Sequence, residues 1–95
     1  MSIRLSRIAA RELRHQLAYL AERNPPAARQ LAADLDALLV ALDGGVFEGP
    51  EKRLLSGRII RTWPLPPLSV YYQRRGAELY VVRIYHQARR PITKP

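Results

Sequence analysis

Asn24-Pro25-Pro26-Ala27-Ala28 divides the first half of the sequence into two leucine-rich segments. Asn24 can cap a helix, and a proline in the first helical turn loses no hydrogen bond, because the amides there have no partner within the helix. The stretch therefore predicts that one helix ends and a second begins within a few residues. Two helices joined by so short a turn should run antiparallel, as a hairpin.

Apolar residues on both sides of this turn follow helical spacing. Before the turn, the spacing predicts an amphipathic helix from about residue 7 to residue 23, with Ser6 as its N-cap. After the turn, it predicts a second helix that Asp43-Gly44-Gly45 ends, so the hairpin covers about residues 7–42. The two apolar stripes consist of Ala9 or Ala10, Leu13, Leu17 and Leu20, and of Ala28, Leu31, Leu35, Leu38 and Leu42.

Strand-like sequence lies on both sides of the hairpin. Alternation of Ile3 and Leu5 with polar residues predicts a short strand at residues 2–6. After Gly57, β-branched and aromatic residues predict strands at 58–63, 69–74 and 78–85. Prolines at 64, 66 and 67 cannot donate to a ladder, so the first of these strands should end near Trp63. We expect a loop at 46–57, in which residues 51–55 could form a helical turn.

These elements predict an α+β fold in the order β-α-α-β-β-β. An N-terminal strand and an antiparallel helical hairpin should pack on a small twisted antiparallel sheet at about residues 58–86, followed by a basic tail at 87–95. The 95 residues should form a single domain. Alternation in the last strand predicts that Tyr80, Val82 and Ile84 face the helices. Val81, Arg83 and Tyr85 should then lie on the opposite face, near the strand that carries Arg61.

Composition excludes several classes of protein. The chain has no cysteine, which excludes disulfides and thiolate metal sites, and its hydrophobic content of 47% is ordinary for a globular protein. No apolar run approaches the ~20 residues of a membrane span, and no apolar signal core follows the N-terminus. We therefore expect a cytoplasmic protein without a cofactor, a metal or a membrane partner.

The net charge of +8 comes entirely from the second half of the chain. Residues 1–50 contain six arginines and six acids, whereas residues 51–95 contain ten basic residues and two acids, Glu51 and Glu78. An acidic or polyanionic partner should therefore meet the second half.

Several short motifs follow one another along the chain. They are Asn24-Pro25-Pro26-Ala27-Ala28, Gly49-Pro50, Leu55-Ser56-Gly57-Arg58, Val70-Tyr71-Tyr72 and Val82-Arg83-Ile84-Tyr85-His86-Gln87-Ala88-Arg89-Arg90. Together with the order of the elements, these motifs resemble the ParE/RelE toxin superfamily. The resemblance implies a compact toxin of a type II toxin-antitoxin system, neutralised by an antitoxin whose flexible segment wraps it in a hetero-oligomer.

Differences within the superfamily indicate which branch fits. RelE-like members cleave messenger RNA in the ribosomal A site with basic residues and, in some branches, a glutamate, a strand arginine before the Tyr-Tyr region and a C-terminal His-Tyr. Here Leu68-Ser69 precede Val70-Tyr71-Tyr72, where many relatives carry the strand arginine, and the chain continues beyond His86 to Pro95. ParE-like members poison DNA gyrase without a catalytic set, through their C-terminal residues. The resemblance therefore favours a gyrase poison, with a ribosome-dependent endoribonuclease as the alternative.

Basic and aromatic residues at the end of the predicted sheet are the candidate site. The second half offers no paired carboxylates, and its only histidine has no second ligand for a metal. His15 should be exposed on the polar side of the first helix, near Arg11, whereas Trp63 and Tyr72 should lie in the core. The candidates for target binding are Arg83, Tyr85, His86, Arg89 and Arg90. If the protein is RelE-like, the catalytic candidates are Arg61, Arg83 and His86.

A third hypothesis is a plain basic nucleic-acid binder, whose affinity would fall steeply with salt. An antitoxin, under either toxin hypothesis, should be acidic or amphipathic, because it has to cover the basic end of the sheet or apolar grooves.

Overall fold

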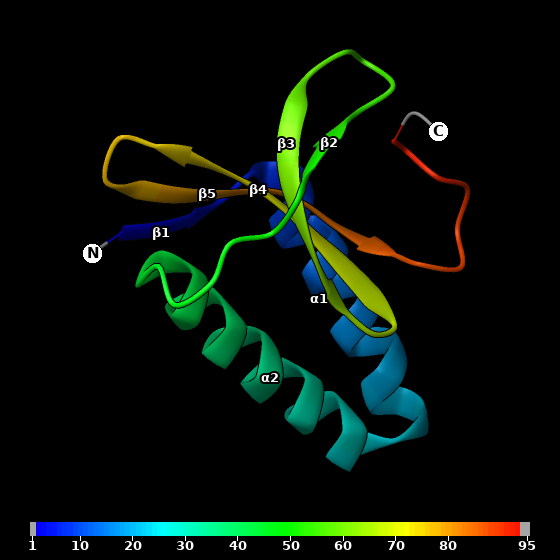
Figure 1. Ribbon diagram of the computed structural model, residues 1–95. Helices are drawn as coiled ribbons and strands as arrows, with labels where there is room; N and C mark the ends of the chain where they lie inside the picture. The colour runs from blue at the N-terminus through cyan, green and yellow to red at the C-terminus, as the bar shows by residue number, and fades with distance from the viewer. Residues whose placement is uncertain (1, 94–95) are drawn as a thin grey trace.

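Two helices and five strands make up the computed structural model, which describes residues 2–93. The predicted α+β fold is confirmed, with a helical hairpin beside a twisted sheet (Figure 1). Lys94 and Pro95, at the end of the predicted tail, lie outside the described residues. In chain order the elements are β1 (Ser2–Leu5), α1 (Arg7–Arg23), α2 (Pro25–Asp43), β2 (Glu51–Arg53), β3 (Ile59–Leu65), β4 (Leu68–Arg75) and β5 (Glu78–His86).

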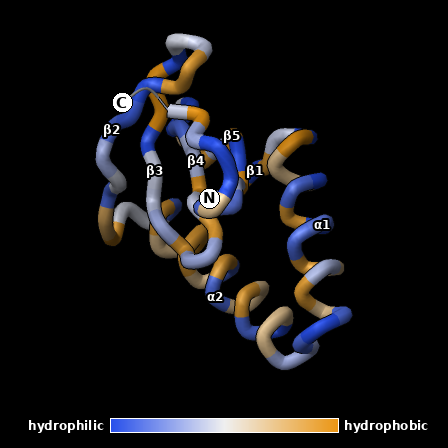
Figure 2. Tube along the Cα trace, turned by 90° about the vertical axis from the view of Figure 1, so that its right-hand side faces the viewer, coloured by the Kyte–Doolittle hydropathy of each residue, from blue (hydrophilic) through white to orange (hydrophobic). Residues whose placement is uncertain are grey.

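The helical hairpin forms through the predicted caps. Ser6 Oγ accepts a hydrogen bond from the Ala9 amide at 2.9 Å and begins α1. Asn24 ends α1 with its backbone amide, which donates to the Leu20 carbonyl at 2.7 Å, and begins α2 with its side chain, which accepts from the Ala27 amide at 3.1 Å. A single residue thus serves both helices, which explains the short turn. Both helices carry apolar positions interspersed with polar ones (Figure 2). Neither helix is long and apolar enough to cross a membrane.

The strands form one sheet in the order β1-β5-β4-β3-β2. β3, β4 and β5 pair antiparallel, as predicted, and β2 also pairs antiparallel with β3. β1 instead runs parallel to β5, from Ser2 opposite Glu78 to Leu5 opposite Val81. The sheet is therefore mixed. Because β1 ends at Leu5, it covers only the first part of β5 and leaves the edge beyond Val81 for other partners.

Two predicted boundaries around β3 were wrong. Residues 51–53, expected in a loop or a helical turn, form the edge strand β2, whose side chains are all exposed, so no apolar alternation revealed it. β3 continues through Pro64 to Leu65. The Thr62 amide donates to the Pro50 carbonyl at 3.1 Å, and the Pro64 nitrogen, two residues later, points to the same side of β3. The pairing with β2 extends only as far as Arg61 and does not reach Pro64. Pro64 therefore interrupts no ladder hydrogen bond.

The predicted faces of β5 were partly wrong because the strand contains a bulge. Tyr72 pairs with Val81, but the preceding Tyr71 pairs with Arg83, so Val82 is an extra residue. The bulge shifts the alternation. Ile84 faces the helices and Arg83 and Tyr85 lie on the outer face, as predicted, but Val81 joins the helix-side core, and Tyr80 and Val82 pack on the outer face.

The core therefore has two parts. The helix-side core joins Leu31, Leu35 and Leu42 of α2 to buried residues of the sheet, including Tyr72. The outer cluster consists of Ile60, Tyr71, Val82 and Tyr85, with Leu54, Tyr80 and Ile92 packed against it.

The segment after β5 folds back over the outer face. The Leu55 amide donates to the Ile92 carbonyl at 2.8 Å, and Leu54 forms a β-bridge with Thr93. In Figure 1 this orange-to-red segment leaves β5 and returns toward the end of the β2–β3 hairpin. The predicted basic tail is thus tied to the sheet over its described part.

Candidate target-binding site

Arg83 is held by a glutamate of α1. Its Nε and Nη2 donate to the two carboxylate oxygens of Glu12 at 3.0 and 2.8 Å, and the Ile84 amide donates to the same carboxylate at 3.1 Å. The side chains of Arg83 and Glu12 are only 27% and 13% exposed. The hydrogen bonds to Glu12 raise the pKa of Arg83, so its charge is fixed and already paired.

The contact with Glu12 is one of several that the start of α1 makes with the unpaired edge of β5. Ser6 donates from its backbone amide to the Val81 carbonyl at 2.8 Å and from Oγ to the Val82 carbonyl at 2.7 Å. Together with Glu12, it supplies the partners that β1 does not provide beyond Leu5. The start of α1 therefore fixes the position of the strand that carries the candidate residues.

Tyr85 organises the basic residues next to it. Its ring is buried in the outer cluster, and its hydroxyl donates to the Arg90 carbonyl at 2.5 Å. The guanidinium groups of Arg83 and Arg89 lie 5.1 and 5.3 Å from the ring centre, within the range of cation–π attraction. Arg89 and Arg90 themselves are exposed. The structure therefore brings Arg83, Tyr85, Arg89 and Arg90 together.

His86 lies at the end of β5 and lines a cleft with residues of α1. Its Nδ1 accepts a hydrogen bond from the Ala88 amide at 3.0 Å, which fixes the orientation of the ring. The cleft has a volume of about 240 Å³. It is lined by Arg11, Glu12, His15, Gln16, Ile84, His86 and Arg89.

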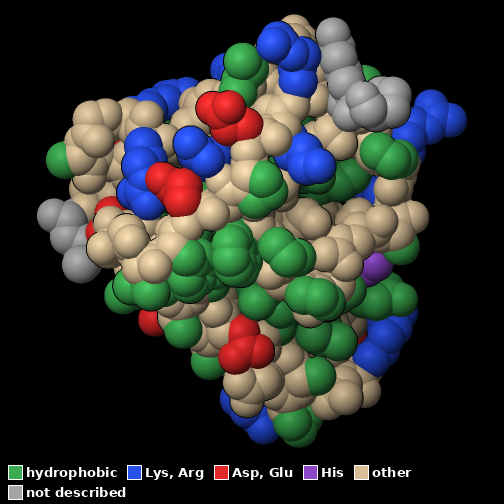
Figure 3. Space-filling model, in the orientation of Figure 1, with side chains coloured by type: hydrophobic (Ala, Val, Ile, Leu, Met, Phe, Trp, Pro, Cys, Tyr) green, Lys and Arg blue, Asp and Glu red, His purple; other side chains and the backbone are tan. Residues whose placement is uncertain are grey.

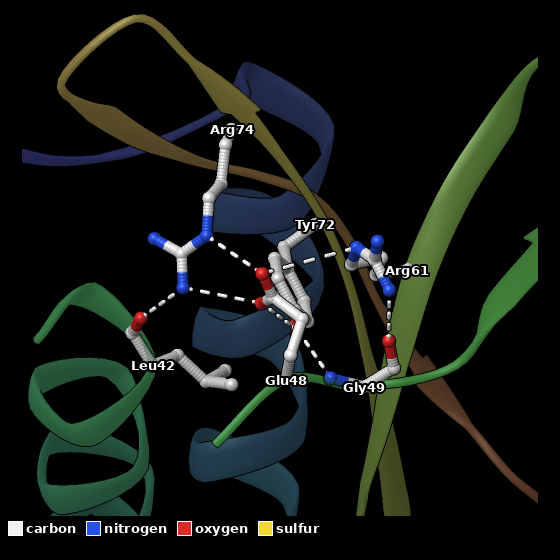
Figure 4. A network of polar contacts seen from close by, with 6 residues as sticks. All are labelled: Leu42, Glu48, Gly49, Arg61, Tyr72 and Arg74. Atoms are coloured by element: carbon white, nitrogen blue, oxygen red, sulfur yellow. Dashed lines mark hydrogen bonds and ion pairs between the residues drawn. The ribbon is translucent and has the colours of Figure 1, made fainter. Parts of the chain in front are cut away.

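Arg61 lies elsewhere, on the helix-covered side of the sheet. It pairs in register with Tyr72, which belongs to the helix-side core, whereas Arg83 pairs with Tyr71 of the outer cluster, and β4 separates the two strands. Its Nη1 donates to the Gly49 carbonyl at 2.7 Å, and its Nε is 3.9 Å from Glu48 (Figure 4). The structure therefore does not bring Arg61 to Arg83 and His86.

The residues around Arg61 form a second polar network, centred on Glu48. The Tyr72 hydroxyl donates to this carboxylate at 2.8 Å and the Arg74 Nε at 3.0 Å, and Arg74 also bonds to the Leu42 carbonyl near the end of α2 (Figure 4). The hydrogen bond from Arg74 lowers the pKa of Glu48. Burial, and then the hydrogen bond to Glu48, raise the pKa of Tyr72. The network joins the 44–50 loop to the sheet and to α2.

Gly49 belongs to the same network for a steric reason. Its amide donates to the Tyr72 hydroxyl at 2.7 Å, and a Cβ atom at this position would lie 2.1 Å from the Thr62 carbonyl oxygen. The loop can approach β3 this closely only because the residue is glycine.

Most of the ionisable side chains that surround His86 are basic. Among residues 2–93 no three histidine or acidic side chains converge to hold a metal ion. Glu12, the acid that lines the cleft, is occupied by Arg83 and the Ile84 amide. This end of the sheet can therefore hold negatively charged groups, and His86 is its candidate for moving a proton.

Comparison with known proteins assigns the family. A sequence profile described as the ParE toxin of the type II toxin-antitoxin system, parDE, matches residues 3–91. The chain belongs to the ParE toxin family. Among solved structures, a chain described as the chromosomal ParDE TA system from P. aeruginosa has a TM-score of 0.71 and 22% sequence identity, over 90% of this chain and 95% of that chain. That likeness shows a shared fold. No curated protein matches this ParE family member.

The resemblance to the ParE/RelE superfamily is thus confirmed on the ParE side, and the family match makes the protein a type II toxin. The match includes every candidate for target binding, because Arg83 to Arg90 lie within residues 3–91.

Sequence reasoning missed the contribution of α1 to this part of the ParE toxin. Glu12 is 71 residues from Arg83, and Arg11 and His15 are as far from His86. His15 is exposed, as predicted, but it lines the cleft beside His86. The only local signal was the spacing of four residues between Arg11 and His15, which places both on one side of a helix.

Proposed function

We propose that this ParE toxin inhibits growth by binding and poisoning DNA gyrase, and that a cognate antitoxin neutralises it. The separation of Arg61 from Arg83 and His86 carries the proposal, because these were the candidates for a catalytic set. Without that three-residue set we expect the toxin to act by docking, and exposed Arg89 and Arg90 next to the buried Tyr85 ring offer a docking surface.

This docking surface suits an acidic protein target. Arginine and tyrosine contribute strongly to protein interfaces, and charge complementarity speeds association and fixes orientation. Arg83 is already paired with Glu12, so we assign it to positioning Tyr85. Arg89 and Arg90 are then the residues that meet the target.

Charge reversal at both residues tests this assignment. Expression of Arg89→Glu/Arg90→Glu should no longer stop growth, because both cations that meet the target have changed sign. The matched control is Arg14→Glu/Arg29→Glu, which makes the same charge change at exposed helix positions and should remain toxic. Circular dichroism of both variants would establish that the fold survives. A folded, fully toxic Arg89→Glu/Arg90→Glu variant would contradict the proposal.

The antitoxin is expected to carry an amphipathic, acidic segment. Figure 3 shows hydrophobic side chains in a band across the face of the molecule that Figure 1 presents, next to charged side chains over the sheet. Phe47 and Trp63 stack with ring centres 4.2 Å apart and are only partly buried. A segment with one apolar and one acidic face would cover such a surface. A short acidic reading frame beside the gene would support this partner.

The position of His86 favours a second candidate function, ribosome-dependent cleavage of messenger RNA. An imidazole beside arginines can move a proton while the guanidinium groups stabilise negative charge on a phosphate. In that case His86→Ala would slow cleavage of A-site codons by orders of magnitude and gyrase would be unaffected. Unchanged cleavage products in this variant would remove the candidate.

A further inference from the structure

The cleft between α1 and the end of β5 gathers four basic side chains from two distant parts of the sequence. Arg11 and His15 come from α1, and His86 and Arg89 come from the end of β5 and the segment after it. Arg11 and His15 are four residues apart, so they project from the same side of the helix.

The positive charge of this cleft is not neutralised within the protein. Both carboxylate oxygens of Glu12, which also lines the cleft, accept hydrogen bonds from Arg83, and one of them also from the Ile84 amide. Among the salt bridges of residues 2–93, none involves Arg11 or Arg89. Two guanidinium groups therefore face the cleft without a counter-charge.

The cleft has hydrogen-bond donors on both α1 and the end of β5. Because His86 Nδ1 accepts from the Ala88 amide, a neutral imidazole carries its proton on Nε2, which is then a donor. Gln16 adds an amide donor from α1. A planar carboxylate can be satisfied by the fork of one arginine, whereas a tetrahedral phosphate takes donors from several directions. The volume of about 240 Å³ suits a small group rather than a drug-sized ligand.

We infer that this cleft is a phosphate-binding site, in which Arg11, His15, His86 and Arg89 hold the oxygens of one phosphate group. The group is either free phosphate or a phosphate of a nucleic-acid backbone. The inference concerns the cleft itself, so it stands or falls separately from the choice of gyrase as the target.

Titration with inorganic phosphate at low ionic strength tests the site, because the chain has only two histidines and their imidazole NMR signals report on the cleft directly. We expect both imidazoles to shift and to saturate. Arg11→Gln should weaken binding by about tenfold or more, the effect of losing a charge-assisted hydrogen bond. Arg29→Gln removes the same charge from an exposed position on α2 and should bind phosphate like the wild-type protein.

A second titration identifies the source of the phosphate. A short single-stranded oligodeoxynucleotide should displace inorganic phosphate if a nucleic-acid backbone occupies the cleft, whereas the same oligonucleotide with uncharged methylphosphonate linkages should not. If neither displaces it, free phosphate is the ligand. Shifts that do not saturate, or that are equal in Arg11→Gln and Arg29→Gln, would overturn the inference. Saturation by a glutamate-rich peptide but not by phosphate would also overturn it.

Discussion

Two glutamates from the neutral half of the sequence hold arginines of the basic half. Glu12 binds Arg83 at the edge of β5, and Glu48 binds Arg74 and lies near Arg61 on the other face of the sheet. Each carboxylate also satisfies a polar group of the fold, the Ile84 amide in one case and the Tyr72 hydroxyl in the other. These arginines are therefore part of the structure, and the charge available for a partner lies elsewhere.

Glu48→Gln should destabilise the protein at neutral pH by roughly 0.5–1 kcal/mol, a small value because the side chain is 39% exposed and water screens its ion pairs. The pKa of Glu48 is lowered in the folded state. Its contribution is therefore complete above the unfolded pKa, near 4.5, and is lost as the pH falls through the lower folded pKa. Urea denaturation at several pH values measures the difference.

The control for this change is Glu51→Gln, at an exposed position of β2. It should alter stability little at any pH. A difference between Glu48→Gln and the wild-type protein that is the same at pH 7 and at pH 3 would contradict the assigned role of the ionised carboxylate.

Among the elements, the helical hairpin was predictable because its signals are local. A cap, two prolines and a spacing of three to four residues lie within the segment that they determine, and Ser6 and Asn24 cap as expected. The sheet was less predictable because its errors depend on pairing. β2 has no buried side chain, and the bulge at Val82 appears only when β4 and β5 are aligned.

Asn24→Ala should lower the free energy of unfolding by about 1 kcal/mol, because the Ala27 amide loses its side-chain acceptor. Asn24→Ser keeps a capping oxygen and should stay close to the wild-type protein. Thermal unfolding followed by circular dichroism compares the three. Equal stability of Asn24→Ala and the wild-type protein would show that the prolines alone fix the turn.

On the scale of the whole molecule, the candidate site could be predicted only in part. The C-terminal residues were accessible to sequence reasoning because they are close together in the chain, and Tyr85, Arg89 and Arg90 do lie together. The contribution of α1 was not accessible, because the fold brings Arg11, Glu12 and His15 to β5 from about 70 residues away. The prediction that Arg61 lies near Arg83 was wrong for the same reason. The face of the sheet on which Arg61 lies depends on the register of β3, β4 and β5.

The distribution of charge over the molecule follows from these contacts. Residues 51–95 carry the surplus of eight positive charges, but Arg83 and Arg74 are paired with acids of the first half. Exposed Arg89 and Arg90, beyond the end of β5, are then available to an acidic surface. This arrangement fits the proposal that the toxin docks on a larger machine.

The most direct test of that conclusion is a gyrase assay on the purified toxin, freed of any antitoxin. The proposal predicts trapped double-strand breaks or lost supercoiling of plasmid DNA, reversed by the antitoxin and absent with Arg89→Glu/Arg90→Glu. Unaffected gyrase, at concentrations of the toxin that stop translation, would contradict the proposal and identify the ribosome as the target.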